Sequence, residues 1–299
     1  ASKTVNVEVV ETPAVETVEV LSDIEDLALE TDMTLRALAI NALGDPVSDG
    51  TIITFTADQG FFPENSYGPT TNGQASVFFN THTTAGPLTV TARVGDVVGT
   101  KEGNIKPGLP ASVSVTPQIQ DDNGAWVNMP PSGIPVNYPD PVRVRARVID
   151  LFNNVVPNTS IQFETDMGGI GNYATTDEEG IAYANYFPGN SAGTAQITAS
   201  TIQVGEDGES IVGIALITIY SDEVNSIIFS VQEEMFLDVI GVGGTTSRSL
   251  EVQLRDFGGN LVSGQHMVLY EIVNADPPAG VNINNSGLSD EVQANDGIA

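Results

Sequence analysis

The chain has 299 residues and a net charge of −29, from 39 acidic and 10 basic side chains. Nucleic acid and anionic membrane surfaces repel a body this acidic, so we exclude both as partners, and no apolar run is long enough to span a bilayer. Cysteine is absent, which excludes disulfides, thiolate metal sites and cysteine catalysis. The 30 glycines and 17 prolines favour short strands joined by turns over a helical fold.

The N-terminal part of the chain is predicted to contain short strands. Lys3–Val10 alternates apolar and polar residues, which predicts a strand ahead of the linker at Pro13. Residues 24–30 could pass for one helical turn, but we interpret them as a switch at a sheet edge because no helix stop signal follows. The other strands expected here are Val15–Leu21, Leu35–Ile40, Thr51–Phe55 and Gly86–Ala92.

The central part contains the clearest strand pattern. Val142–Val148 alternates apolar residues with three arginines, which is typical of a strand with one buried face. Asp150–Asn154 follows, with side chains that hydrogen-bond their own backbone in turns. A proline-rich insertion, Asp121–Asp140, contains the only tryptophan, Trp126. The other strands expected here are Ala111–Thr116, Ser160–Glu164, Ile181–Phe187, Gly193–Thr201 and Ile211–Tyr220.

The same order of strands and turns recurs at a nearly constant spacing. Gly180 follows Gly73 by 107 positions, and Asp256 follows Asp150 by 106. The residues expected to face inward agree as well, namely Leu35, Ala37 and Ala39; Val144, Ala146 and Val148; and Leu250, Val252 and Leu254. A period the size of one sandwich predicts tandem domains at 13–106, 107–220 and 221–299. The proline-containing Lys106–Pro110 and the acidic Ser221–Glu223 are the expected junctions.

Three groups of residues carry a family resemblance. They are Asp150, Asn154 and Val156; Thr176, Asp177, Gly180 and Ala182; and Gly193, Thr198 and Ala199. Together they resemble the bacterial immunoglobulin-like repeats of invasin- and intimin-type surface proteins, most weakly in the first repeat, where Asn41 and Asn72 stand in place of two aspartates. The resemblance implies an all-β, elongated array of antiparallel sandwiches, located outside the cell on a bacterial surface as a stalk or adhesin.

The two ends of the chain differ from a complete repeat. Gly297-Ile298-Ala299 matches Gly180-Ile181-Ala182, after which the second repeat has three further strands. We therefore expect the third domain to lack its final strands. Residues 1–12 are then either the closing strand of a preceding domain, in a window of a longer array, or a strand donated to a neighbouring copy. We favour the window, because one donated strand does not replace three.

No catalytic constellation is recognisable. The histidines, His82 and His266, lie outside the repeated pattern, and no nucleophile elbow, phosphate loop or dinucleotide motif is present. We predict that the chain is not an enzyme and has no organic cofactor. Structural calcium at acidic pairs near junctions and hairpins is an alternative to ordinary solvated turns, although no pair has the spacing of a calcium loop. The candidate pairs are Asp121 with Asp122 and Asp222 with Glu223.

Candidate partner-binding residues form two sets. Arg143, Arg145 and Arg147 make a stripe on one strand face, which we interpret as charge balance against acidic side chains on adjacent strands, with docking of an acidic neighbour as the alternative. The second set consists of aromatic residues expected in loops, where a ring either anchors a partner or sugar or covers a sandwich end. These residues are Phe61, Phe62, Tyr67 and Trp126.

These patterns predict an extracellular structural or adhesive repeat protein that provides rigid spacing or attachment. Its expected partners are other domains of the array, a surface assembly, a glycan, or a protein of a host or neighbouring cell. Two other functions stay open. The chain is a subunit of a filament or layer that assembles by strand addition, or it is a carbohydrate-binding module that uses the 121–140 insertion.

Overall fold

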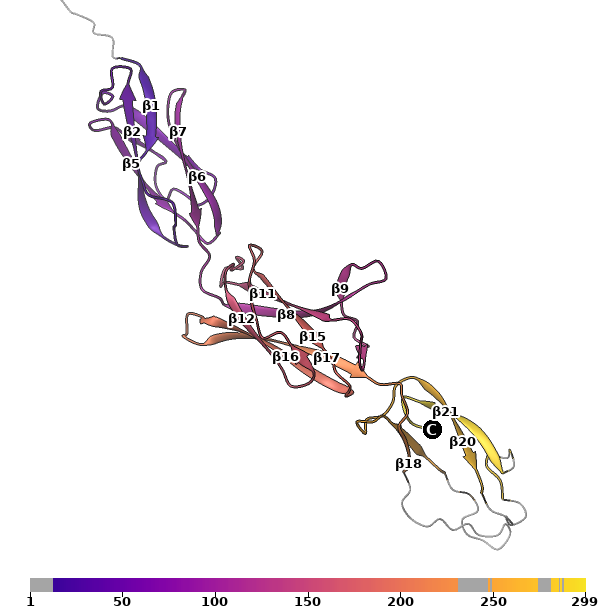
Figure 1. The fold of residues 1–299 in the computed structure, drawn as a ribbon. Coiled ribbons are helices and arrows are strands. Elements are labelled where there is room, and N and C mark those ends of the chain that lie inside the picture. Colours follow the sequence, from indigo (N-terminus) through magenta and orange to yellow (C-terminus); the bar gives the residue numbers. More distant parts are fainter. Residues whose placement is uncertain (1–12, 231–246, 248, 274–280, 285, 287) are drawn as a thin grey trace, which may run out of the picture.

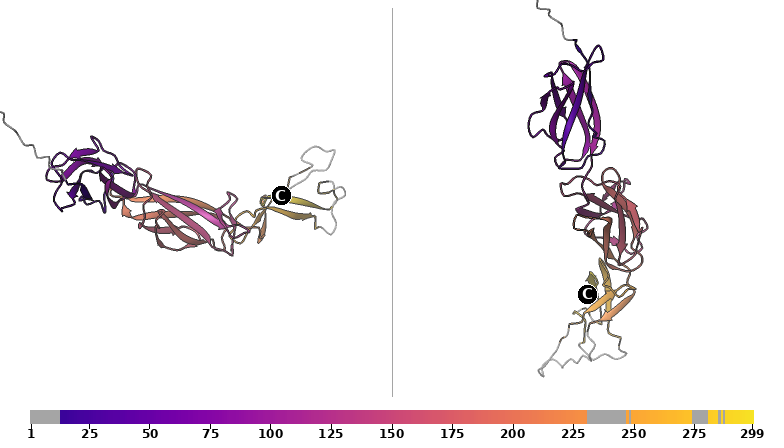
Figure 2. Two further views of the ribbon diagram at one scale, coloured as in Figure 1. Left: turned by 90° about the horizontal axis from the view of Figure 1, so that it is seen from above. Right: turned by 90° about the vertical axis from the view of Figure 1, so that its left-hand side faces the viewer.

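The computed structural model describes residues 13–230, 247, 249–273, 281–284, 286 and 288–299. The strand predicted at Lys3–Val10 lies outside these residues. Within them the chain forms only strands and turns, and they contain no helix long and apolar enough to cross a membrane. Three strand-rich units follow one another along an elongated molecule (Figure 1 and Figure 2).

The first unit is a sandwich of two antiparallel sheets. Its sheets have the orders β1-β2-β5 and β4-β3-β6-β7. The strands are β1 (Val15–Val20), β2 (Asp32–Asn41), β3 (Ile52–Ala57), β4 (Tyr67–Pro69), β5 (Gln74–Asn80), β6 (Gly86–Val94) and β7 (Val97–Ile105). The inward set predicted for β2, Leu35, Ala37 and Ala39, is fully buried.

The segment after β1 changes sheets. Leu27 forms a parallel bridge with Ile105 at the end of β7, which belongs to the opposite sheet from β1. The edge switch predicted over residues 24–30 is therefore confirmed. Because the chain contributes to both sheets here, the two layers are joined along one side of the sandwich.

The second unit repeats this plan with more strands. Its sheets have the orders β13-β15-β11-β8-β9 and β10-β17-β16-β12-β14. The strands are β8 (Ser112–Gln120), β9 (Trp126–Asn128), β10 (Ile134–Pro135), β11 (Val142–Ile149), β12 (Ser160–Thr165), β13 (Gly169–Ile170), β14 (Tyr173–Thr175), β15 (Ile181–Phe187), β16 (Gly193–Val204) and β17 (Ser210–Tyr220). Val144, Ala146 and Val148 of β11 are fully buried, as predicted, which places the arginines between them on the outer face.

The insertion lies at the sheet switch of the second unit. The chain pairs with β11 through β8, turns back as β9, and then reaches the opposite sheet, where Ile134 of β10 lies parallel to Ile219 of β17. This parallel contact is the counterpart of the Leu27–Ile105 bridge in the first unit. The insertion is thus a hairpin added where the first strand crosses between the sheets (Figure 1).

A repeated glycine explains the regular spacing of the units. Gly180 has a φ of +71°, and a Cβ at this position would lie 2.8 Å from the carbonyl oxygen of Val148. Gly73 and Gly297 also have positive φ, and their added Cβ would lie 2.9 Å from a carbonyl oxygen of the neighbouring strand. Only glycine meets both requirements, so each repeat retains it at the same turn.

The third unit has a smaller described core. Its strands are β18 (Ser226–Phe229), β19 (Val252–Arg255), β20 (Gln265–Glu271) and β21 (Ser289–Asn295), paired as β18-β19 and β20-β21. Val252 and Leu254 are buried, as predicted. The inward assignment of Leu250 is wrong, because this side chain is 36% exposed and β19 begins two residues later.

Candidate functional site at the junctions and on the arginine face

The turn at residues 150–154 is organised by one buried carboxylate. Asp150 is 3% exposed, and its Oδ1 accepts hydrogen bonds from the backbone N–H groups of Phe152 and Asn154, both at 2.9 Å. Asn153 occupies the left-handed region with a φ of +68°, which asparagine tolerates better than most residues. The same carboxylate reaches the linker, because Oδ2 accepts a 2.9 Å hydrogen bond from the N–H of Gly108.

The side chain of Asn154 connects the first unit to the second. Its Nδ2 donates to the carbonyl oxygen of Thr83, and its Oδ1 accepts from the N–H of Ala85, each at 2.9 Å. The same Nδ2 donates to Oδ2 of Asp150 at 2.9 Å, which holds the amide in this orientation. We call the arrangement of Asp150, Asn154 and the backbone of Thr83 and Ala85 the first clasp.

The junction between the second and third units repeats part of this arrangement. Asp256 is 5% exposed, and its Oδ1 accepts from the N–H of Asn260 at 2.8 Å. The Nδ2 of Asn260 donates to the carbonyl oxygen of Ala192 at 3.0 Å, and Ala192 follows Ala85 by 107 positions. The N–H of Ser263 also donates to the carbonyl oxygen of Ser221 at 2.7 Å. We call Asp256, Asn260 and the backbone of Ala192 the second clasp.

The matching turn of the first unit has the opposite side chains. Asn41 stands in the place of Asp150, and its Oδ1 accepts from the N–H groups of Leu43 and Asp45, at 2.9 and 3.1 Å. Asp45 stands in the place of Asn154 and is exposed. An ionised carboxylate has no hydrogen to donate, so this turn lacks the donor that both clasps use.

The motif is visible in the sequence, but the clasp is not. Asp150 and Asn154 were predicted as turn-forming residues and as part of the family resemblance, without a role between domains. The signal that points to such a role is an asparagine at the same place in two repeats, Asn154 and Asn260. Each of these two repeats begins directly after a short linker. The partner atoms belong to backbone 69 and 71 residues away, and no pattern in the sequence identifies them.

The three arginines of β11 have no acidic residue in register with them among the described strands. In register with Arg143, Arg145 and Arg147 lie Asn185, Tyr183 and Ile181 on β15 and Gln118, Thr116 and Ser114 on β8. The ion pairs found among the described residues are Arg93 with Asp96 and Lys106 with Asp26. The interpretation of the stripe as charge balance against adjacent strands is therefore wrong. We call the outer surface of β15, β11, β8 and β9 the arginine face.

The insertion brings its tryptophan onto the arginine face. The Cζ atom of Arg143 lies 4.2 Å from the ring centroid of Trp126 and 4.6 Å from that of Tyr183. Nε and Nη2 of Arg143 donate to Oε1 of Gln118 at 3.1 and 2.7 Å. Trp126 begins strand β9 and is half-buried, so the prediction that it lies in a loop is wrong.

The other aromatic candidates lie apart from Trp126, in the first unit. Phe62 packs against the core with its ring 5.4 Å from that of Phe79, which suits a cover over the sandwich end. Tyr67 is exposed in strand β4 rather than in a loop. Phe61 is exposed and meets the ring of His82 edge-on at 5.7 Å.

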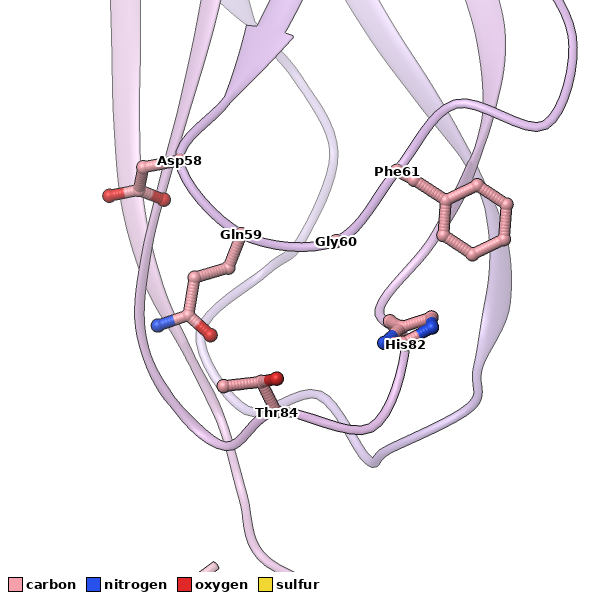
Figure 3. Close-up of a pocket in the computed structure, with 6 residues that line it drawn as sticks. All are labelled: Asp58, Gln59, Gly60, Phe61, His82 and Thr84. Atoms are coloured by element: carbon pink, nitrogen blue, oxygen red, sulfur yellow. The ribbon is translucent and has the colours of Figure 1, made fainter. Parts of the chain in front are cut away.

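A shallow recess lies at the end of the first unit, beside the loop that enters the first clasp (Figure 3). Its polar groups hold the loops together. Oδ1 of Asp58 accepts from the N–H of Thr89, Nε2 of Gln59 donates to the carbonyl oxygen of Pro87, and Nδ1 of His82 lies 3.1 Å from Oγ1 of Thr83. Within the part of the chain that the structure describes, no carboxylate contacts His82.

His266 lies inside strand β20, and its Nε2 contacts the carbonyl oxygen of Ser263 at 3.0 Å. The acidic candidates are also separate. Oδ1 of Asp121 accepts hydrogen bonds from the N–H groups of Asn123 and Ala125. Asp122, Asp222 and Glu223 are exposed. Among the described residues, no three carboxylate or imidazole groups converge where they could hold a metal ion.

No family model matches the chain, and no curated protein is significantly similar to it in sequence. InvD of Yersinia pseudotuberculosis is similar in structure, with a TM-score of 0.51 at 14% identity over 95% of this chain and 81% of InvD. The Escherichia coli adhesin FdeC has a TM-score of 0.49 at 12% identity over 95% of this chain and 90% of that chain.

Invasin, a bacterial integrin-binding protein, has a TM-score of 0.40 at 18% identity over 85% of this chain. The chain covers 49% of that structure, so it spans about half of the length of invasin. At these identities the similarity concerns the fold, and the match to InvD carries it. The chain has the tandem immunoglobulin-like fold of bacterial proteins of the invasin and intimin type.

Proposed function

We propose that the chain is part of an extracellular, non-enzymatic stalk on a bacterial cell surface, in which immunoglobulin-like domains give rigid spacing to an adhesive or structural protein. The domains of this proposal are 13–106, 107–220 and 221–299. The fold shared with InvD supports the class of protein. The single observation that carries the proposal of rigidity is the first clasp, with its partial repetition at the second junction.

The first clasp restrains the junction through side chain and linker together. Asn154 makes two hydrogen bonds to the preceding unit, each contributing about 0.5–1.5 kcal/mol to stability. Asp150 ties the linker to the same turn through Gly108, and two prolines in Lys106–Pro110 restrict the linker backbone. A junction held at three points has fewer orientations available than a flexible tether, which is the property that a spacer needs.

Distance measurements between spin labels test this proposal. The chain contains no cysteine, so Ser76→Cys in β5 and Thr194→Cys in β16 place two labels at exposed strand positions of the first and second units. We expect one narrow distance distribution, which Asn154→Ala broadens. Asp45→Ala, at the matching turn of the first unit, is the control and leaves the distribution unchanged. A parent distribution as broad as that of Asn154→Ala would contradict rigid spacing.

Structural calcium at the acidic pairs, Asp121 with Asp122 and Asp222 with Glu223, stays a prediction. A ligand that binds only the folded state raises the melting temperature. We expect calcium binding, if these pairs provide it, to raise Tm in millimolar calcium relative to a chelator. An unchanged Tm would mean that calcium does not bind at these pairs, and the role proposed for the clasps would stand.

A further inference from the structure

We propose that the arginine face binds an extended acidic polypeptide segment whose carboxylates stand on alternate residues. Arg143, Arg145 and Arg147 would each pair with one carboxylate. This site is separate from the clasps and adds a partner to the proposed stalk.

Charge is the first argument. The molecule carries a net charge of −29, yet three of its ten basic residues lie in one row. The residues in register with them on β8 and β15 are amides, hydroxyls or apolar groups, and no acidic side chain pairs with them among the described residues. The row is therefore a cationic surface that no acid among the described residues pairs with, and it complements an acidic partner.

Geometry is the second argument. Alternate residues of a strand lie about 6.6–6.8 Å apart, so the three arginine side chains leave β11 at this interval. Alternate side chains of an extended peptide repeat at the same interval on one face. A peptide lying along β11 would thus present a carboxylate to each arginine, and the planar guanidinium fork matches a carboxylate with two hydrogen bonds.

The first and third units show that the fold does not require these arginines. The positions that match Arg143, Arg145 and Arg147 hold Thr34, Arg36 and Leu38 in the first unit and Ser249, Glu251 and Gln253 in the third. Trp126 belongs to an insertion that only the second unit has at its sheet switch among the described strands. The arginine face is a property of one unit and not of the repeat.

The stacking around Arg143 favours an anion over a neutral sugar. Trp126 and Tyr183 both hold the Arg143 guanidinium at 4.2–4.6 Å, so the ring faces available at this point already carry a cation. Gln118 fixes the same group with two hydrogen bonds. Arg143 is therefore positioned before any partner arrives, and the guanidinium groups of Arg145 and Arg147 make no hydrogen bond or ion pair within the described part of the chain.

Two peptides of equal charge test the proposal on the whole chain. One alternates six Glu with six Thr, and the other carries the same six Glu in one block followed by six Thr. We expect the alternating peptide to bind about tenfold more tightly, a difference of about 1.4 kcal/mol. Binding is measured by peptide fluorescence anisotropy at ~0.15 M salt, where a Debye length of about 8 Å screens the rest of the acidic surface. The only tryptophan, Trp126, gives a second signal located on the face.

Matched variants identify the surface. Arg145→Gln with Arg147→Gln should weaken the alternating peptide at least tenfold while leaving Tm unchanged. Arg36→Gln with Lys101→Gln removes the same charge from the first unit and should leave binding as it was. The proposal would be overturned if Arg145→Gln with Arg147→Gln left the affinity for the alternating peptide unchanged. It would also be overturned if neither peptide bound. If both peptides bound equally and a sulfated polysaccharide bound more tightly, the partner of the arginine face would be an acidic glycan and the proposed polypeptide would be wrong. None of these outcomes alters the spin-label distances that test the stalk.

Discussion

The turns at residues 41–45 and 150–154 have the same backbone but opposite chemistry. In both turns the first side chain accepts hydrogen bonds from the N–H groups two and four residues later. A left-handed residue stands just before the fifth position in each, Gly44 with φ +85° and Asn153 with φ +68°. The carboxylate comes first at Asp150 and last at Asp45.

This difference separates what a turn needs from what a junction needs. A turn needs only an oxygen at its first residue, which Asn41 and Asp150 both supply. A clasp also needs a donor at the fifth residue and an acceptor that orients it, which only the order Asp then Asn provides. The first unit therefore keeps the turn without the means to form a clasp, and the first three predictions below test this distinction.

The largest effect is expected for Asp150→Ala. This change leaves the partly buried N–H groups of Gly108, Phe152 and Asn154 without their acceptor, and an unsatisfied group costs about 1–3 kcal/mol when it is shielded from water. We expect the free energy of unfolding of the second unit to fall by about 3 kcal/mol or more in urea denaturation. Asp121→Ala removes the same pattern of turn bonds at a solvent-accessible hairpin and should cost about 1 kcal/mol or less. If Asp150→Ala and Asp121→Ala lowered the free energy of unfolding equally, the burial of Asp150 would contribute nothing to stability.

Asn154→Asp should have the next largest effect. The substitution removes the donor to Thr83 and places a second carboxylate where Nδ2 lies 2.9 Å from Oδ2 of Asp150. We expect a loss of about 2 kcal/mol from the lost bond and the repulsion, together with a broadened spin-label distance between the first two units. Asp45→Asn is the reverse change in the first unit and should be within about 0.5 kcal/mol of the parent. If the distance distribution of Asn154→Asp were unchanged, the Asn154 amide would not be what makes the junction rigid.

The two clasps should differ in strength. Asn154 makes two bonds to the preceding unit at 2.9 Å, whereas Asn260 makes one at 3.0 Å. Asn260→Ala should therefore cost about 1 kcal/mol and Asn154→Ala about 2 kcal/mol, since each such bond contributes about 0.5–1.5 kcal/mol. With spin labels placed across each junction, Asn154→Ala should broaden the distance distribution more than Asn260→Ala does. A larger effect at the second junction would mean that contacts other than the clasp hold it.

The smallest effect is expected for Tyr186→Phe. Tyr186 is fully buried, and its hydroxyl has no hydrogen-bond partner among the described residues, while Phe79 holds the matching position in the first unit. Removing an unpaired buried hydroxyl should change the free energy of unfolding by less than about 1 kcal/mol, with stabilisation the expected sign. A clear loss of stability would indicate an ordered water on that oxygen.

The same variant has a pH signature. Burial, with a smaller contribution from Asp166, raises the pKa of Tyr186 from 10.0 to about 12. Because the folded pKa is the higher one, this group's contribution to stability is complete below pH 10 and is lost as the pH rises towards 12. Urea denaturation across that range should show a decline in the parent that is shallower in Tyr186→Phe. Tyr270, whose pKa burial also raises, accounts for part of any decline that remains.

Local patterns in the sequence determined most of the fold. The alternation in Val142–Val148 identified Val144, Ala146 and Val148 as buried, because side chains of a strand point to opposite faces in turn. The repeated glycines and aspartates located the turns, since their conformational requirements depend on a few adjacent residues. Leu250 shows the limit, because the pattern does not state where a strand begins.

The tertiary structure alone decided the two candidate functional surfaces. Asn154 meets backbone 69 and 71 residues away, and Arg143 meets Trp126 and Tyr183 from two other strands. That no acid lies in register with the arginines among the described residues likewise depends on strand register, which pairs β11 with β8 and β15. Contacts between distant segments depend on how sheets and units pack, and that packing is set by the whole core rather than by the residues that meet.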